Sequence, residues 1–219
     1  MKYVHLAEAI GEDKAASIRH KTVTVVGLGG IGSAVSTLLV RSGVPVRIIE
    51  KGRVSDEDLD RLAMFSHDDV SKFKATQAKK HLNRINPDVM VKSFNEEINK
   101  ETLFLMDADV IIDCTASEEL TVMISKYCYR KKIPMVFGGV RDTKTIVVSY
   151  VPGDKPVHEQ LRNIKHELTE GLIPAATYMA AGFLYIKALK ILTGQKPKKG
   201  VVIYDTWKQQ FEDKKGKKK

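Results

Sequence analysis

Short runs of aliphatic and β-branched residues alternate with longer stretches of helical periodicity through the first two thirds of the chain. The apolar runs predict strands over residues 22–26, 46–50, 89–94, 109–113 and 134–138. The stretches between them predict helices over residues 31–42, 57–63, 74–86 and 117–131. Strands and helices that alternate in this way form parallel sheets through right-handed crossovers. The predicted fold class is α/β, with a doubly wound, Rossmann-like sheet that is mostly parallel.

The pattern changes after residue 140. An apolar strand is predicted over residues 143–151, and so little chain separates it from the preceding strand that the two should pair antiparallel. Residues 152–172 are polar and predict a long surface loop, which at this length is usually functional. A helix over residues 173–193 and a short strand over 201–205 follow. We therefore expect antiparallel C-terminal strands, in a single domain over residues 1–213.

The formal net charge of +9 raises the question of nucleic-acid binding. Five of these charges belong to the last six residues, KKGKKK, so the rest of the chain carries only four. A lysine-rich end of this kind is expected to be a solvated, disordered tail over residues 214–219. Because no aromatic-rich basic motif accompanies the tail, nucleic-acid binding is disfavoured.

Hydropathy and cysteine usage favour a cytoplasmic protein. No run approaches the roughly 20 apolar residues that span a bilayer, and acidic residues occupy the N-terminal segment in place of an apolar signal core. The two cysteines, Cys114 and Cys128, are too few for a disulfide framework or for a four-cysteine zinc site. The sequence therefore predicts no membrane segment and no zinc.

A glycine-rich turn separates the first predicted strand from the first predicted helix, with the spacing Gly27-x-Gly29-x-x-Gly32. Such turns bind phosphate through backbone amides at the start of the helix. The residues expected to bind the phosphates are Gly27, Leu28, Gly29, Gly30, Ile31 and Gly32. Glu50 ends the second strand, 18 residues after Gly32, where an acid accepts hydrogen bonds from ribose hydroxyls. A nucleotide is favoured, and NAD, FAD and ATP all remain open.

Two cations that follow the second strand favour a triphosphate. Arg61 and Lys74 would leave the carboxyl edge of the sheet near the phosphate-binding turn. Cations there neutralise the charge that builds on the β- and γ-phosphates when a carboxylate attacks the α-phosphate. The two charges of a dinucleotide pyrophosphate need less compensation.

Several stretches, in this order, resemble the ThiF/MoeB/HesA family, the bacterial and archaeal relatives of ubiquitin-activating enzymes. They cover residues 22–211 and read VVGLGGIGS, VRIIEKGRVS, DLDR, KATQAKKHLNRINPDV, DVIIDCT, KKIPMVFGGV and GLIPAATYMAAGFLYIKALKILTG with VVIYDTW. The resemblance implies an enzyme that uses ATP and Mg²⁺ to adenylate a carboxylate, with release of pyrophosphate. The usual substrate is the C-terminal glycine of a ubiquitin-like or sulfur-carrier protein, and the usual assembly is a homodimer.

The resemblance also implies roles for individual residues. Glu50 corresponds to the ribose acid, and Arg61 and Lys74 to the cations that contact the phosphates. Ile98 falls where the family lines the adenine pocket, and Thr115 is a further ATP-binding candidate. The candidate catalytic residues are Arg61, Lys74 and Asp113.

The chain departs from the family pattern at several of these positions. Glu50 replaces the usual aspartate, Asp58 replaces an asparagine that faces the phosphates, and Leu62 replaces a glutamine. At Ala116 the family has a second aspartate that helps to bind Mg²⁺. Asp113 or Glu118 is the candidate substitute.

The N-terminal segment has no clear match to the family helix whose arginines reach the partner subunit's ATP. Tyr3 occupies roughly that position, and Lys2 and Arg19 are the nearby cations. His158 and His166, in the predicted loop, are expected to be solvent-exposed. Cys114 and Cys128 are expected to be structural thiols, so the reaction would stop at the adenylate.

Three functions follow from these observations. The first is adenylation of a sulfur-carrier tail, or of a small carboxylate such as the guanylylpyridinol precursor of the iron-hydrogenase cofactor, as in the archaeal HcgE branch of the family. The second is a non-catalytic nucleotide-binding subunit of an activating enzyme, which Ala116 favours. The third is an NAD-dependent oxidoreductase, which leaves Arg61 and Lys74 unexplained.

Overall fold

In the computed structural model, eight strands form one mixed sheet in the order β3-β2-β1-β4-β5-β6-β7-β8. The structure describes residues 2–164 and 173–212. The strands are β1 (Val23–Val26), β2 (Val46–Ile49), β3 (Val91–Phe94), β4 (Val110–Asp113), β5 (Met135–Arg141), β6 (Lys144–Tyr150), β7 (Val202–Asp205) and β8 (Gln210–Glu212).

Strands β1 to β5 run parallel, and β6 to β8 continue the sheet antiparallel. Val23 at the start of β1 pairs with Val46 on one side and with Val110 on the other, so the parallel strands end along one edge. β5 and β6 form a hairpin in which Arg141 pairs with Lys144. The predicted mostly parallel sheet with antiparallel C-terminal strands is therefore confirmed.

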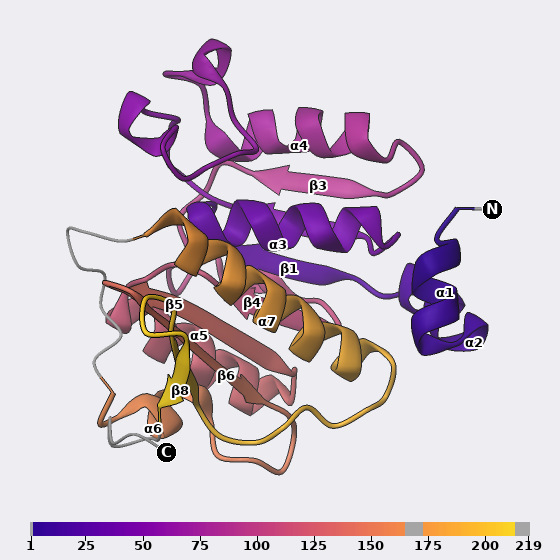
Figure 1. Cartoon of the computed structure of the whole chain (residues 1–219), viewed down its shortest axis with the longest axis vertical. Helices are drawn as coiled ribbons and strands as arrows, with labels where there is room; N and C mark the ends of the chain where they lie inside the picture. Colours follow the sequence, from indigo (N-terminus) through magenta and orange to yellow (C-terminus); the bar gives the residue numbers. More distant parts are fainter. Residues whose placement is uncertain (1, 165–172, 213–219) are drawn as a thin grey trace.

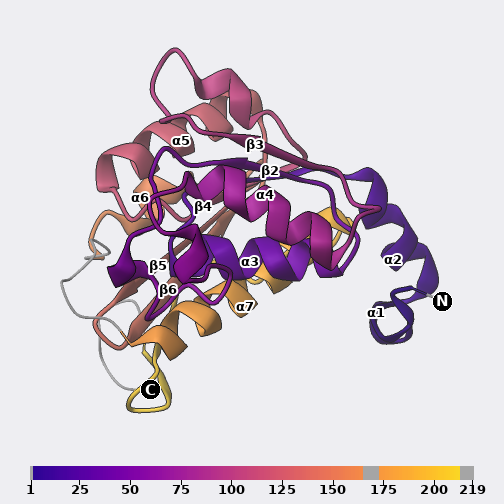
Figure 2. The same ribbon diagram turned by 90° about the horizontal axis from the view of Figure 1, so that it is seen from above.

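Helices cover both faces of the sheet. They are α1 (Val4–Ile10), α2 (Glu12–Ser17), α3 (Gly30–Arg41), α4 (Lys74–Ile85), α5 (Glu118–Lys131), α6 (Val157–Leu161) and α7 (Pro174–Leu192). Figure 1 shows the sheet with α3, α4 and α7 in front of it. Figure 2 shows α5 on one side of the sheet and α3 and α7 on the other. Because successive side chains of a strand point to opposite faces, Val25 joins the core under α3 and α7 and Val26 joins the core under α5.

The helix α7 is long and apolar enough to cross a membrane by length and composition alone, with a mean hydropathy of 1.3 over an 18-residue window. The expectation that no segment approaches this length is therefore wrong. Half of that window is buried inside the protein, as in the core helix of a domain. A Cβ added at Gly138 of β5 would lie 2.6 Å from Leu184 Cδ1, which shows how closely α7 packs on the sheet.

The segment between β2 and α4 differs most from the predicted elements. The helix predicted over residues 57–63 is a single 3₁₀ turn, Asp56–Asp58, in which the Asp58 carboxylate accepts a hydrogen bond from the Ser55 backbone N–H. A short polar side chain that bonds its own backbone in this way competes with helix formation. Two isolated bridges, Arg53 to Phe73 and Val54 to Val70, close the segment instead.

The sequence pattern did not predict several elements, some at the ends of the described chain and some within it. They are α1, α2, α6 and β8, together with the 3₁₀ turns Ile18–His20, His67–Asp69 and Leu103–Met106. The strand β8 exists because Gln210 pairs back onto Asp205 across a short turn. The predicted tail over residues 214–219 lies outside the described residues, and its disorder stays a prediction.

Candidate nucleotide-binding cleft

A cleft of about 310 Å³ opens at the carboxyl ends of β1, β2 and β4. Of the residues predicted to form the site, the cleft is lined by Gly27, Gly29, Glu50, Arg61, Lys74, Ile98 and Thr115. The predicted residues Leu28, Gly30, Ile31, Gly32, Asp113 and Glu118 are not among its lining residues. In open α/β sheets this edge is where ligands bind.

Close packing explains why the first and last residues of the turn's motif, Gly27 and Gly32, are glycines. Gly27 has a φ of +88°, and a Cβ there would lie 2.8 Å from the Cys114 carbonyl oxygen. A Cβ at Gly32 would lie 1.9 Å from the carbonyl oxygen of Gly27. Only glycine lets α3 start this close to β1. The amino end of α3, with its partial positive charge, therefore lies at the cleft.

Glu50 connects the glycine turn to its own loop. Its Oε2 accepts a hydrogen bond from the Leu28 backbone N–H at 2.8 Å, and its Oε1 accepts one from the Gly52 N–H at 2.6 Å. Each oxygen of an ionised carboxylate keeps a second lone pair for a ligand hydroxyl. The Leu28 side chain is buried, and its backbone N–H fixes Glu50.

Asp58 lies between the two predicted phosphate-binding cations. Lys74 Nζ lies 2.7 Å from Asp58 Oδ2, and Arg61 Nη2 lies 3.1 Å from Oδ1. Burial raises the pKa of Asp58, but the hydrogen bonds from Lys74 and Ser55 outweigh it and hold the pKa below its usual value. The ionised Asp58 therefore offsets one of the two positive charges. The acid that departed from the family pattern is compensated by both cations.

Arg61 is held in place along its own turn. Its Nη1 donates to the Glu57 carbonyl oxygen at 2.6 Å and to Asp60 Oδ1 at 2.9 Å. Its side chain is 29 % exposed, against 14 % for Lys74. Arg61 is therefore the more accessible of the two cations.

Asp113 is fully buried and does not line the cleft. Its Oδ1 accepts hydrogen bonds from the Thr115 N–H at 2.9 Å and the Thr115 hydroxyl at 2.8 Å, and its Oδ2 accepts one from the Thr121 hydroxyl at 2.7 Å. Asp113 thus fixes the connection between β4 and α5. Glu118 is exposed at the start of α5. Neither Asp113 nor Glu118, the predicted substitutes for the missing aspartate, therefore lines the cleft.

Ala116, the position at which the family has an aspartate, does lie at the cleft. Ala116 lines it and adopts a left-handed backbone conformation, with a φ of +56°. Aspartate and asparagine adopt this conformation more readily than alanine. The carboxylates that do line the cleft are Glu50, Asp58, Glu96 and Glu97.

Away from the phosphate-binding cations, the cleft is lined by buried apolar side chains and by a charged pair nearer its surface. Ile98 is 3 % exposed and lines it with Val26, Ile49 and Leu120. Lys51 and Glu97 form an ion pair of 2.6 Å at the rim. An apolar floor of this kind suits a planar ring.

The N-terminal cations lie at the other end of the sheet. Lys2 pairs with Asp88, and the Tyr3 hydroxyl accepts a hydrogen bond from Asn86 Nδ2 at 2.7 Å. The Arg19 guanidinium lies 5.6 Å from the centre of the Tyr3 ring. Because Asn86 and Asp88 precede β3, these contacts are at the amino edge, opposite the cleft (Figures 1 and 2). Within one chain, neither cation reaches the cleft.

Both cysteines are free and buried. Burial raises the pKa of Cys114 and of Cys128 well above the usual value, and the Asp113 carboxylate adds to this. A thiol with a raised pKa is a poor nucleophile near neutral pH. This agrees with a structural role for both.

The expectation that His158 is solvent-exposed is wrong. It is half-buried, with Nδ1 2.9 Å from the Ser125 hydroxyl oxygen, and burial lowers its pKa. The reason is α6, which packs His158 against α5 where a loop was predicted. His166 lies outside the described residues.

Comparison with known proteins gives the family. The ThiF family model matches residues 3–219. The chain belongs to the ThiF family. It is 28% identical over 212 residues to "Sulfur carrier protein ThiS adenylyltransferase" of Bacillus subtilis, a match that covers 91% of this chain and 62% of that protein. It is 27% identical over 212 residues to "Molybdopterin-synthase adenylyltransferase" of Escherichia coli, covering 92% and 85%.

Solved structures agree with the fold of this ThiF-family chain. A crystal structure of E. coli MccB with ATP has a TM-score of 0.81 at 22% identity, covering 91% of this chain and 64% of that one. A structure of PaaA has a TM-score of 0.79 at 21% identity, covering 92% and 66%. The chain therefore spans less than two thirds of the length of the ThiS adenylyltransferase and of MccB.

Proposed function

We propose that this ThiF-family chain binds ATP in the cleft and uses it to adenylate a carboxylate. The convergence of Arg61 and Lys74 on Asp58, beside the glycine turn and Glu50, is the observation that carries the proposal. An oxygen of the carboxylate attacks the α-phosphorus, the bond to the β-phosphate oxygen breaks, and pyrophosphate leaves. The products are an acyl-adenylate and pyrophosphate.

The cleft residues take separate parts in this reaction. The amides of the glycine turn bind phosphate, Glu50 accepts from the ribose, and Ile98 packs against the adenine. Arg61 and Lys74 stabilise the charge that grows on the leaving pyrophosphate. Thr115, which lines the cleft beside Ala116, is a further contact for ATP. No general base is needed, because a carboxylate is already ionised at neutral pH.

Asp58 is the residue that fits a magnesium ion best. Mg²⁺ bound with a nucleotide typically takes one or two protein carboxylates and fills its other positions with phosphate oxygens and water. Asp58 is the cleft carboxylate in contact with the phosphate-binding cations, whereas Glu50 is assigned to the ribose. When bound, the ion would neutralise phosphate charge during the attack.

The substrate is either the C-terminal glycine of a sulfur-carrier protein or a small-molecule carboxylate. The names of the B. subtilis and E. coli relatives support the first. A small carboxylate such as the guanylylpyridinol precursor is the second. A homodimer and a cytoplasmic location, with Mg²⁺ and without zinc, belong to the same proposal.

Pyrophosphate release tests the proposal. The full chain is incubated with ATP, Mg²⁺ and either ThiS or a guanylylpyridinol carboxylate, and we expect release with one of the two. Absence of pyrophosphate release with both carboxylates would sink the enzymatic proposal. Stabilisation against thermal unfolding by NAD and not by ATP would favour the oxidoreductase instead.

A non-catalytic nucleotide-binding subunit is the second candidate, and Ala116 is the observation that favours it. Such a subunit would bind ATP tightly without turnover and would co-purify with a homologous, active subunit. Turnover by the isolated chain would exclude this function.

A further inference from the structure

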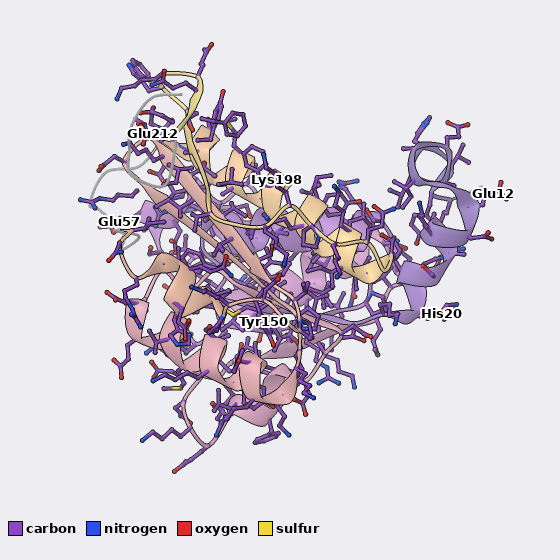
Figure 3. The ribbon with its side chains drawn as sticks, turned by 90° about the horizontal axis from the view of Figure 1, so that it is seen from below. Glu12, His20, Glu57, Tyr150, Lys198 and Glu212 are labelled. Atoms are coloured by element: carbon purple, nitrogen blue, oxygen red, sulfur yellow. The ribbon has the colours of Figure 1, made fainter. Side chains whose placement is uncertain are left out.

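A second cavity, of about 510 Å³, lies between α7 and the C-terminal strands. Its lining is largely apolar and includes Phe183 and Ile186 of α7, Ile203 of β7 and Phe211 of β8. It shares no lining residue with the nucleotide-binding cleft. Figure 3 labels Lys198 on the segment beside α7 and Glu212 at the end of the described chain, both of which line it. Its size is that of a small-molecule site.

Lys187 places a buried ammonium in the wall of this cavity. The residue is 7 % exposed, and its Nζ donates to the Lys198 carbonyl oxygen at 2.7 Å and to the Ser149 hydroxyl at 3.2 Å. Within residues 2–164 and 173–212, no carboxylate lies within ion-pair distance of it. A buried charge held only by neutral acceptors is costly. An anion in the cavity would remove that cost.

The charged groups around Lys187 are mostly of the same sign. In the described part of the chain, Lys190 on the same helix and Lys198 on the facing loop form no ion pair with an acid, and Lys199 pairs with Asp154 at 2.5 Å. The acid in the cavity wall, Glu212, pairs with Lys144 at 2.9 Å. Burial and then the neighbouring lysines lower the pKa of Lys187 to about 8, so it is still mainly protonated at pH 7.

We propose that this cavity binds an apolar small molecule with one anionic head group, of the type of a medium-chain carboxylate, whose head pairs with Lys187. The apolar wall accepts the chain and the lysines select the charge. A cationic or neutral ligand gains no ion pair there. The lysine-rich end of the protein, residues 214–219, has the same sign as the cavity and is disfavoured as its occupant.

Binding of decanoate to the full chain, measured at pH 7 by calorimetry, tests this inference. We expect saturable binding that ATP does not displace. Lys187→Met should weaken it about tenfold or more, since a hydrogen bond to a charged group is lost. Lys196→Met, an exposed lysine of the same loop that does not line the cavity, should leave the affinity unchanged. Equal affinity of the Lys187→Met protein and the wild type, or no binding by the wild type, would overturn the inference.

Two further measurements keep the test independent of folding defects. Ile186→Glu places a negative charge at a half-exposed position of the cavity wall, and we expect it to weaken the binding of decanoate but not of uncharged decanol.

Decanoate is ionised throughout the range of pH 7–9.5, whereas Lys187 loses its proton through about pH 8. The wild-type affinity should therefore fall as the pH rises through 8, and the Lys187→Met affinity should not. A flat wild-type profile would count against Lys187 as the partner of the head group.

Discussion

Asp58, Arg61 and Lys74 form a small charge network at the phosphate side of the cleft. Asp58 is 4 % exposed and contacts both cations, so their positions are fixed before any ligand arrives. Positioned charges stabilise a transition state without a cost of reorganisation. The sequence identifies Arg61 and Lys74 as candidates but gives Asp58 only as a departure from the family pattern. The compensation is a tertiary contact between the 3₁₀ turn and α4, which spacing along the chain does not reveal.

Replacing Lys74 with alanine should weaken ATP binding. Truncating one partner of a partly buried charge pair costs about 2 kcal/mol or more, which corresponds to about thirtyfold in Kd. Lys80→Ala, on an exposed position of the same helix, is the matched control. Calorimetry with ATP and Mg²⁺ measures both. A Lys74→Ala protein that is folded and binds ATP like the wild type would contradict a phosphate-binding role.

Restoring the missing carboxylate should raise activity. Ala116 lines the cleft in a left-handed conformation that aspartate tolerates well, so Ala116→Asp adds charge without backbone strain. We expect Mg²⁺-dependent pyrophosphate release to rise about tenfold, through a further metal-binding oxygen. Ala116→Asn has the same backbone preference without the charge and serves as the control. Equal rates for the two variants would mean that a carboxylate at this position is not limiting.

The elements of the parallel half follow from the sequence because each has a clear local signal. The strands are apolar runs, and α4 ends at Ile85, with Asn86 extended just before Pro87. The unpredicted elements lack such signals. β8 depends on pairing with β7, and α1 and α2 contain only one buried residue, Ala15. A tertiary contact therefore decides β8, whereas α1 and α2 lack the buried apolar face from which a helix is predicted.

The junction of β1 and α3 is the element that the glycines control most directly. Gly32→Ala brings a Cβ to 1.9 Å from the Gly27 carbonyl oxygen, so the backbone of the turn or of the helix must shift. We expect a loss of about 3 kcal/mol in the free energy of unfolding, measured with urea, from this overpacking. Gly182→Ala, in α7 with no atom within 4 Å, should instead stabilise the protein by about 0.5–1 kcal/mol. Similar stabilities for the two variants would contradict this packing.

At the scale of the whole molecule, the nucleotide-binding cleft and the cavity of Lys187 lie at different parts of one sheet. The parallel strands end at the nucleotide-binding cleft, and the antiparallel strands with α7 enclose the cavity of Lys187. The position of the cleft follows from the sequence, because parallel strands bring their carboxyl ends together. The second cavity does not, because it depends on how residues 197–203 fold back beside α7.

The central claim is that this chain adenylates a carboxylate. The transfer of an oxygen atom from the carboxylate to AMP tests this claim most directly. If the substrate carboxylate attacks the α-phosphate, a carboxylate labelled with ¹⁸O passes one labelled oxygen to the phosphate. Hydrolysis of the acyl-adenylate at its carbonyl carbon then releases AMP that carries the label. Mass spectrometry of the nucleotide after incubation with ATP, Mg²⁺ and the labelled carboxylate that supports pyrophosphate release should show ¹⁸O in AMP. Unlabelled AMP, or ADP as the product, would contradict adenylation by this chain.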